Sequence, residues 1–357
     1  MAKFSEVLTI INGKNQKQVE NPQGKYPIYG SGGIMGYADD FICDGDTVVI
    51  GRKGSINNPI FVKEPFWNVD TAFGLSANQK VLLPKYLYYF CKSFDFDQLN
   101  TTVTIPSLTK ANLLQIEIPL LPLENQQQIV FVLDKLTDLI SLRKQQLAKL
   151  DELVKARFVE MFGECDLSHP QQTWMAIKEI GTVIGGATPK TNIDEYWGGA
   201  YRWITPAEID EDSGYIYDSV RKLTKAGIDS CSLQEIPIGT VILSSRAPIG
   251  KVAIAGNTFY CNQGFKNIVC KDNMLPRFLY TVLLTNVHYL NSLGRGATFK
   301  EISKAIVENI QVPVPPIELQ TQFSAFIEEI DKSRLTIQQG LDKLETLKKS
   351  LMQEYFG

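Results

Sequence analysis

Apolar residues recur every seven positions in two separate stretches of the chain, and Lys, Glu and Gln fill most of the positions between them. A heptad repeat sustained over about four periods indicates a coiled coil. Two amphipathic helices that each pack on their own domain would show the same pattern. However, a helix of about 40 residues is ~60 Å long, which exceeds the flank of one small domain. The rows are Leu133, Ile140, Leu147, Val154 and Met161 in the first stretch, and Ile330, Ile337, Leu344 and Leu351 in the second.

The two helical stretches are copies of one another. Residues 116–163 and 310–357 align without a gap at an offset of 194 residues (310 minus 116), and about a third of the paired positions are identical. In each copy, prolines impose extended chain just before the helix, and a Phe-Gly pair ends it. Chance does not place such residues in register, so the chain contains an internal duplication. The matched pairs are Pro119 with Pro313, Pro122 with Pro316, Glu124 with Glu318, Gln126 with Gln320, and Phe162 with Phe356.

Short apolar runs separated by turn residues fill the segments outside the helices. In the first segment, residues 47–51 and 59–62 are typical of strands, and residues 85–94 are typical of a helix. In the second segment, residues 239–256 correspond to the two strands, and residues 278–290 correspond to the helix. The second copy has an additional stretch near its start. The two segments are therefore predicted to be duplicated, diverged domains.

The chain thus has the order domain, helix, domain, helix, and we predict an α+β fold. The first mixed α/β domain spans residues 1–123, and the first spacer helix spans 124–163. The second domain spans 164–317, and the second helix spans 318–357. Helix one leaves the first domain and ends beside the second, so a second helix that packs on it must run back. We therefore expect an antiparallel coiled coil with a pseudo-twofold axis between the domains.

Composition sets bounds on compartment and partners. A chain of 357 residues with 44% hydrophobic content can bury two ordinary cores. It has no apolar run of about 18 residues or more and no apolar N-terminal stretch, so we expect neither a membrane-spanning helix nor a signal peptide. The six cysteines form no Cys-x-x-Cys pair and are interpreted as reduced thiols of a cytoplasmic protein. The net charge of -3 neither supports nor excludes a nucleic-acid partner.

Catalytic and metal-binding motifs are scarce. The chain has two histidines, His169 in a polar loop and His288 in a stretch that predicts a packed position in an apolar helix. Zinc sites and Ser-His triads therefore have little support. Residues 58–61 depart from the Asn-Pro-Pro-aromatic motif of amino-methyltransferases, because Ile60 stands in place of the second proline. The glycine-rich stretch 29–36 lacks the strand and helix of a phosphate loop and is interpreted as a turn. No catalytic, metal-ligating or cofactor-binding residue is predicted.

The order of these parts resembles the specificity (S) subunit of type I restriction–modification systems. Both helices are entered through a P-x-x-P-x-E-x-Q-x-Q pattern and end in Phe-Gly. The first domain matches in residues 26–39 and differs in residues 68–71. The resemblance covers essentially the whole chain, and the order of the parts is more specific than any single motif. The matching segments of the second domain are 195–209, 239–254, 261–268 and 294–305.

This resemblance implies a non-catalytic subunit that supplies DNA sequence specificity. In the family, each domain is a target recognition domain that recognises one half of a bipartite, asymmetric site in double-stranded DNA. The helices bind two methyltransferase (M) subunits, which carry the S-adenosylmethionine site and methylate adenine, and restriction (R) subunits join to form the nuclease. The chain itself would need no cofactor. Two alternatives are a self-contained DNA methyltransferase or nuclease, and a coiled-coil scaffold that carries two β-rich binding domains.

Polar residues near the strand ends are the candidates for DNA contact. Arg and Lys can pair with guanine, Asn and Gln with adenine, and Ser, Thr and Lys with phosphate. The strand alignment places Arg246 opposite Lys53, beside Arg52. Each candidate also has a structural interpretation, since Arg202 suits a solvated surface and Asn262 a turn. The predicted DNA-binding residues are Arg52, Lys53, Ser55 and Thr102 in the first domain, and Arg202, Ser245, Arg246, Asn262, Gln263, Lys266 and Arg295 in the second.

Overall fold

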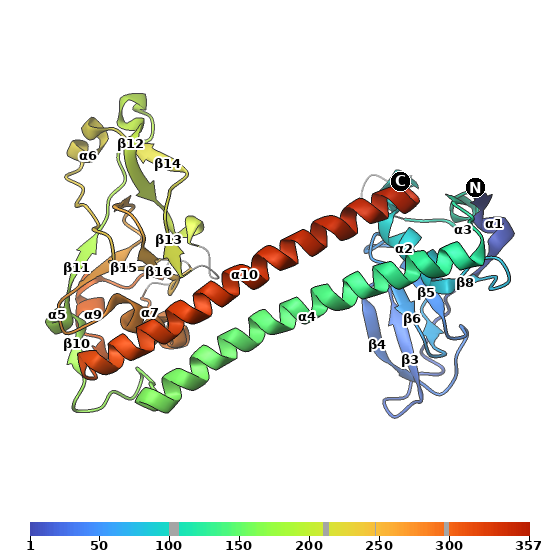
Figure 1. The fold of residues 1–357 in the computed structure, drawn as a ribbon, viewed down its shortest axis with the longest axis horizontal. Helices are drawn as coiled ribbons and strands as arrows, with labels where there is room; N and C mark the ends of the chain where they lie inside the picture. The colour runs from blue at the N-terminus through green and yellow to red at the C-terminus, as the bar shows by residue number, and fades with distance from the viewer. Residues whose placement is uncertain (100–106, 210–213, 247, 296–299) are drawn as a thin grey trace. The chain divides into compact units, whose positions relative to one another are not determined.

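The computed structural model of the chain divides into two compact units, each of which contains one domain and parts of both long helices (Figure 1). Unit 1 comprises Met1–Ala148 and Leu335–Gly357, and unit 2 comprises Lys149–Arg334. The predicted α+β class, with two repeated domains and two long helices, is confirmed. The structure describes residues 1–99, 107–209, 214–246, 248–295 and 300–357.

Unit 1 is built on a four-stranded antiparallel sheet. Every residue of its strand β5 is buried, which explains the unbroken apolar character of that segment. Helix α2 (Pro84–Ser93) packs its buried Tyr86, Leu87 and Phe90 into the same core as the sheet. The predicted strands and helix of this domain are therefore confirmed. The strand order is β2 (Leu8–Asn12), β8 (Ala72–Ala77), β5 (Thr47–Gly51) and β6 (Ile60–Val62).

A smaller sheet in unit 1 carries a glycine-rich hairpin. Strand β3 (Tyr26–Gly30) pairs antiparallel with β4 (Gly33–Ala38) and parallel with β7 (Trp67–Asn68). The predicted turn at 29–36 is confirmed only at its centre, because the residues on either side of positions 31 and 32 are strand. The remaining elements are β1 (Ala2–Lys3), α1 (Phe4–Val7), the 3-10 turn Phe96–Leu99, α3 (Lys110–Leu113) and β9 (Glu117–Ile118).

Unit 2 repeats this topology with additions. Its larger sheet has the order β11 (Gly181–Gly185), β18 (Lys266–Cys270), β15 (Val241–Leu243), β16 (Val252–Ala255) and β13 (Tyr215–Ile216). Its smaller sheet again has a central strand with one antiparallel and one parallel neighbour. The order of this sheet is β14 (Arg221–Leu223), β12 (Trp197–Ile204) and β17 (Tyr260–Cys261).

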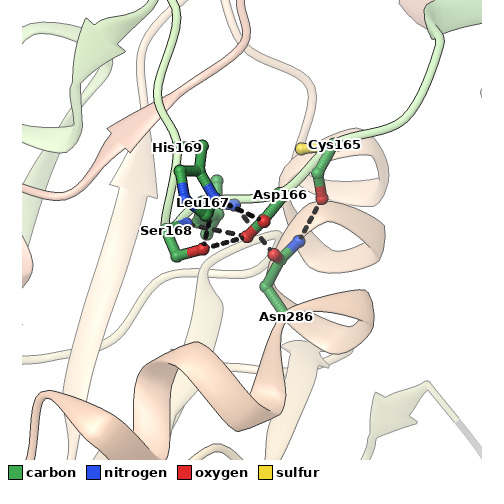
Figure 2. Close-up of polar contacts among 6 residues, drawn as sticks. All are labelled: Cys165, Asp166, Leu167, Ser168, His169 and Asn286. Atoms are coloured by element: carbon green, nitrogen blue, oxygen red, sulfur yellow. Dashed lines mark hydrogen bonds and ion pairs between the residues drawn. The ribbon is translucent and has the colours of Figure 1, made fainter.

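The predicted second-domain helix is two helices, α7 (Pro276–Thr285) and α8 (Val287–Ser292). They meet at Asn286, whose φ of −116° and ψ of 26° are not helical. The Asn286 side chain bonds the chain that follows the first long helix: its Nδ2 donates to the Cys165 carbonyl, and its Oδ1 accepts from the Leu167 amide (Figure 2). Unit 2 also contains β10 (Met175–Ala176), α5 (Ile177–Ile180), α6 (Lys225–Ser230), α9 (Lys304–Glu308) and β19 (Gln311–Val312), with 3-10 turns at Asp194–Tyr196 and Pro206–Glu208.

The long helices are α4 (Leu123–Phe162) and α10 (Ile317–Phe356), one residue earlier at each end than predicted. In unit 1, Lys144 forms an ion pair with Glu345 at 2.8 Å, and Lys348 donates to Thr137 at 2.8 Å. These contacts follow opposite orders along the two helices. In unit 2, Arg334 of α10 bonds Asp151 of α4 at 2.7 Å. The heptad residues are buried or half-buried, while many of their neighbours are exposed. The predicted coiled-coil packing stays a prediction.

The Phe-Gly ends of the helices pack into the domain cores. In unit 1, the Phe356 ring lies 5.1 Å from Tyr86. In unit 2, the Phe162 ring lies 4.8 Å from Phe278 and 5.5 Å from Phe323. Aromatic pairs at these separations add to the stabilisation from burial alone. In the part of the chain that the structure describes, no helix is long and apolar enough to span a bilayer.

Candidate nucleic-acid interface

A polar cluster in unit 2 brings together several predicted DNA-binding residues around Glu301, which is not among the predicted ones. Arg246 Nη2 lies 3.0 Å from one oxygen of the Glu301 carboxylate, and Lys266 Nζ lies 3.4 Å from the other. Lys266 also donates to Ser245 Oγ at 3.2 Å and to the Gln263 carbonyl at 3.5 Å. We name these five residues the Glu301 cluster.

Backbone hydrogen bonds fix the position of this cluster. The Ser245 amide donates to the Gly264 carbonyl at 2.7 Å, and its own carbonyl accepts from the Ile302 amide at 2.9 Å. Arg295 and Glu301 exchange two backbone hydrogen bonds, of 3.1 and 3.0 Å. The loop that carries Arg295, the end of strand β15 and the start of strand β18 are thereby held together.

The electrostatics of the cluster favour an ionised carboxylate between two cations. Partial burial would raise the pKa of Glu301, but the hydrogen bond from Arg246 and the charges of Lys266 and Arg246 outweigh it and lower that pKa. The Lys266 side chain is 12% exposed, whereas the Arg246 side chain is 45% exposed. Arg246 can therefore reach a ligand in solvent, while Lys266 and the buried Ser245 support it from beneath.

The equivalent loop of unit 1 has the same backbone frame. The Arg52 amide donates to the Thr71 carbonyl at 2.8 Å, and the Arg52 carbonyl accepts from the Leu108 amide at 2.9 Å. The next residue, Lys53, forms a β-bridge with Ser107, as Arg246 does with Glu301. The predicted equivalence of Lys53 and Arg246 is therefore confirmed by the hydrogen-bond pattern.

Three of the four predicted residues of unit 1 lie on one exposed loop. Arg52, Lys53 and Ser55 follow strand β5 and are all exposed. The Arg52 guanidinium lies 5.7 Å from the centre of the Phe73 ring, a cation–π contact that orients it. The remaining candidate, Thr102, lies outside the described residues.

The side chains of Arg202, Asn262 and Gln263 have other surroundings. Arg202, on strand β12, bonds Asp218 at 3.1 Å. The Asn262 side chain accepts a hydrogen bond from the Gly264 amide at 2.9 Å. This contact agrees with the alternative interpretation of Asn262 as a turn residue. The Gln263 side chain is exposed and accepts from the Thr188 hydroxyl. None of these contacts joins the side chains of Arg202 and Asn262 to the Glu301 cluster.

Arg221 is a cation of unit 2 that the sequence did not single out. Its guanidinium stacks 3.5 Å from the centre of the Trp197 ring and 5.5 Å from that of Trp203. The two tryptophans stand in the segment 195–209 that carries the family resemblance, but nothing in their spacing indicates which cation would lie over them. Glu301 escaped prediction for a similar reason, because its partners are distant in sequence.

A Ser-His-Asp combination does occur, in the loop after helix α4, but it lacks the geometry of a catalytic triad (Figure 2). In a triad, the hydroxyl and the carboxylate contact opposite nitrogens of the imidazole. Here Ser168 Oγ lies 2.9 Å and Asp166 Oδ2 lies 2.8 Å from the same nitrogen, Nδ1 of His169. Ser168 also donates directly to Asp166 at 2.6 Å. Hydrogen bonds from Ser168 and then His169 lower the pKa of Asp166 to about 2. The group is a hydrogen-bonded turn.

Two further sequence interpretations are settled by the structure. His288 is exposed, so the predicted packed position is wrong. It lies on α8, which is separated from the buried helix α7 by the break at Asn286. Asn58 accepts from Lys92 at 3.2 Å just before strand β6 begins at Ile60, which makes the segment a strand entry. Within the described ranges, no three His, Cys, Asp or Glu side chains are grouped so as to hold a metal ion.

Comparison with known proteins places the chain in a family. The family model described as the type I restriction modification DNA specificity domain matches residues 1–152 and 172–347. Because these matches cover most of the chain, the protein belongs to this family. The predicted family, the specificity subunits of type I restriction–modification systems, is confirmed by that membership.

Individual relatives agree with the family. The MjaIX specificity subunit of a type I restriction enzyme from Methanocaldococcus jannaschii is 40% identical over 185 residues, which are 50% of this chain and 43% of that relative. The chain thus spans less than half of that relative's length. The crystal structure of a type I restriction-modification S subunit from M. genitalium has a TM-score of 0.61 at 18% identity, covering 100% of this chain and 95% of the other. A chain from a structural study of complex assembly in the type I R-M system also has a TM-score of 0.61, at 16% identity, covering 99% and 96%. Both structures share the fold.

Proposed function

We propose that each domain recognises one half of a bipartite, asymmetric sequence in double-stranded DNA. The repeated loop carries this proposal: Arg52 with Lys53, and Ser245 with Arg246, follow equivalent strands and have the same backbone hydrogen bonds. The backbone hydrogen bonds of the two loops are the same, whereas their side chains differ. Such a pair suits two domains that contact different bases in the same manner.

The side chains divide by exposure into groups that reach DNA and groups that support them. Arg246 is the candidate for bidentate pairing with a guanine, because its guanidinium is exposed and held by Glu301. Lys266 and Ser245 are assigned to positioning Arg246 and the loop, since they are mostly or fully covered. Exposed Arg52, Lys53, Ser55 and Arg295 suit phosphate or base contacts, whereas Thr102, Arg202, Asn262 and Gln263 stay predictions.

The helices are proposed to form an antiparallel coiled coil with pseudo-twofold symmetry, which sets the distance between the two DNA-reading domains. Helix α4 has its first turn in unit 1 and Phe162 in the core of unit 2, while α10 begins in unit 2 and has Phe356 in the core of unit 1. Opposite courses of this kind support the proposal.

The same helices are the proposed docking site for two methyltransferase (M) subunits. They expose large apolar side chains that neither domain covers: Phe131, Leu139, Leu142, Leu335 and Leu347. In the proposed complex, S-adenosylmethionine is bound by the M subunits, and restriction (R) subunits join to cut DNA. We propose that this assembly acts in the cytoplasm.

Methylome sequencing of a host with and without the gene tests the proposal. The expected result is a bipartite motif, methylated on adenine, that disappears when the gene is deleted. A matching gel shift should show specific binding only when the M subunit is present with the chain. A purified chain that methylates DNA by itself, or a methylome unchanged by the deletion, would overturn the proposal.

A further inference from the structure

The hairpin of β3 and β4 in unit 1 exposes two consecutive large apolar side chains at its tip. Ile34 is 55% exposed and Met35 is 63% exposed, whereas Ile28 on the paired strand is 1% exposed. The register shifts between Ile28 and Tyr29, which pair with Gly36 and Ile34, so Met35 is an extra, bulged residue. Bulges re-aim side chains and are frequent next to functional sites. This bulge presents two apolar groups to solvent together.

The tip lies against the predicted DNA-contacting loop of the same unit. A Cβ on Gly51 would fall 2.9 Å from the Ser31 Cβ and 2.4 Å from the Ser55 carbonyl oxygen. Glycine at position 51 thus lets the hairpin turn touch the backbone just before Arg52. The turn itself depends on Gly33, whose φ of 122° is disfavoured for other residues. The hairpin that carries the apolar tip is therefore in contact with the loop that carries the exposed cations Arg52 and Lys53.

We propose that Ile34 and Met35 contact thymine methyl groups in the major groove of the half-site that the first domain recognises. This inference rests on the proposed DNA-binding function. A two-stranded β-ribbon fits the major groove, and the thymine C5-methyl is the apolar group that the groove offers. Adjacent Arg52 and Lys53 supply the phosphate attraction that brings the tip there. Unbranched Met35 can adapt its shape to a methyl group.

Replacing thymine by deoxyuracil removes only the methyl group and provides the test. Binding of the chain in complex with its M subunits is measured on the target duplex, with all thymines of one half-site or of the other replaced. For the wild-type complex, the replacement in one half-site should weaken binding about fourfold for each contacted methyl. The Ile34→Ser/Met35→Ser variant should bind the original duplex more weakly and show no response to deoxyuracil. Val81→Ser, an exposed apolar site of the same unit whose carbonyl accepts from Gln126, should behave as wild type.

The possible results separate this inference from the function on which it rests. A wild-type complex that does not distinguish the target from other duplexes would contradict the DNA-reading function itself. Specific binding that changes less than about twofold with deoxyuracil in either half-site would overturn only the thymine contact. The same conclusion follows if the double variant keeps the full deoxyuracil response, or if it loses the M subunits. The wild-type measurement alone decides the matter should the variant fail to fold.

Discussion

Gln126 and Gln320 make the same three side-chain hydrogen bonds, each in the first turns of a long helix. Both are fully buried. In each case Oε1 accepts from a backbone amide next to the domain's own helix, and Nε2 donates to two carbonyls. The partners are the Leu83 amide with the Val81 and Leu121 carbonyls for Gln126, and the Leu275 amide with the Asn273 and Pro315 carbonyls for Gln320. Each glutamine ties the helix to its domain at the junction.

Replacing either glutamine should destabilise the junction. Gln126→Ala and Gln320→Ala leave buried backbone groups without partners, so each should lower the free energy of unfolding by about 1–3 kcal/mol. Gln126→Glu keeps the acceptor and loses both donors, and it should cost at least as much. Urea denaturation followed by circular dichroism measures the loss. Gln127→Ala, at an exposed neighbouring position, is the control and should change stability little. Equal effects at positions 126 and 127 would show that the buried bonds contribute nothing.

The duplicated glutamines were visible in the sequence, but their role was not. Matching in register predicted that Gln126 and Gln320 are equivalent, and the heptad rows predicted both helices to within a residue. Helical periodicity and proline positions are local patterns, so they can be recognised in the sequence without knowledge of the tertiary structure. The break at Asn286 was not predicted, because an asparagine bonded to Cys165 and Leu167 follows from contacts far apart in the sequence.

Within the candidate interface, the sequence predicted only those features that follow from aligning the two copies of the repeat. The alignment placed Lys53 opposite Arg246, and the two backbones match. Glu301 was missed because its pairing with Arg246 joins residues separated by more than fifty positions. The burial of Ser245 was hidden for the same reason, since a serine after a strand is as readily exposed as covered.

Glu301 should matter for discrimination more than for affinity. Glu301→Gln removes a negative charge beside Arg246 and Lys266, so binding to non-target duplex should tighten at low salt. Because Arg246 loses the carboxylate that orients it, preference for the target should fall about tenfold in one half-site. Arg246→Ala should lose preference in the same half-site, and fluorescence anisotropy on half-site variants measures both.

A matched control is available on helix α9. Glu308 is paired with Lys304 at 3.7 Å, outside the Glu301 cluster, and Glu308→Gln should leave discrimination unchanged. If Glu301→Gln and Glu308→Gln have equal effects, or if both half-sites relax together, then Glu301 does not position Arg246.

The hydrogen bonds of the Asp166 turn should make a contribution to the stability of the fold that is lost in acid. Its folded-state pKa, about 2, lies below the ordinary value of 3.8. The bonds to the ionised carboxylate therefore stabilise the fold above about pH 4, and this contribution is lost as the pH falls toward about 2. Asp166→Asn should be less stable than wild type near neutral pH, and the difference should shrink across that window. Urea titrations at a series of pH values test this.

A substitution at Ser168 tests whether the Asp166 turn has a catalytic role. Ser168→Ala removes the hydrogen bond that lowers the Asp166 pKa most. The folded-state pKa of Asp166 should therefore lie closer to its ordinary value, and the pH range over which stability is lost should narrow. DNA discrimination by the complex should not change. A loss of function from Ser168→Ala without any change in stability would mean that the turn has a chemical role.

The length of the two helices should set the number of base pairs between the two DNA half-sites. The ion pair of Lys144 with Glu345 and the ion pair of Asp151 with Arg334 mark the two ends of a segment in each helix, residues 144–151 of α4 and 334–345 of α10. Inserting three heptads in both segments keeps the apolar rows in phase and adds about 32 Å of rise. That length is close to one turn of B-DNA, so the domains should meet the same face of the duplex. Methylome mapping should then recover both half-sites unchanged, with a gap longer by about nine or ten base pairs. The same insertion in one helix alone cannot lengthen an antiparallel pair, and it should abolish bipartite recognition. An unchanged gap in the doubly lengthened protein would show that the helices do not set the spacing.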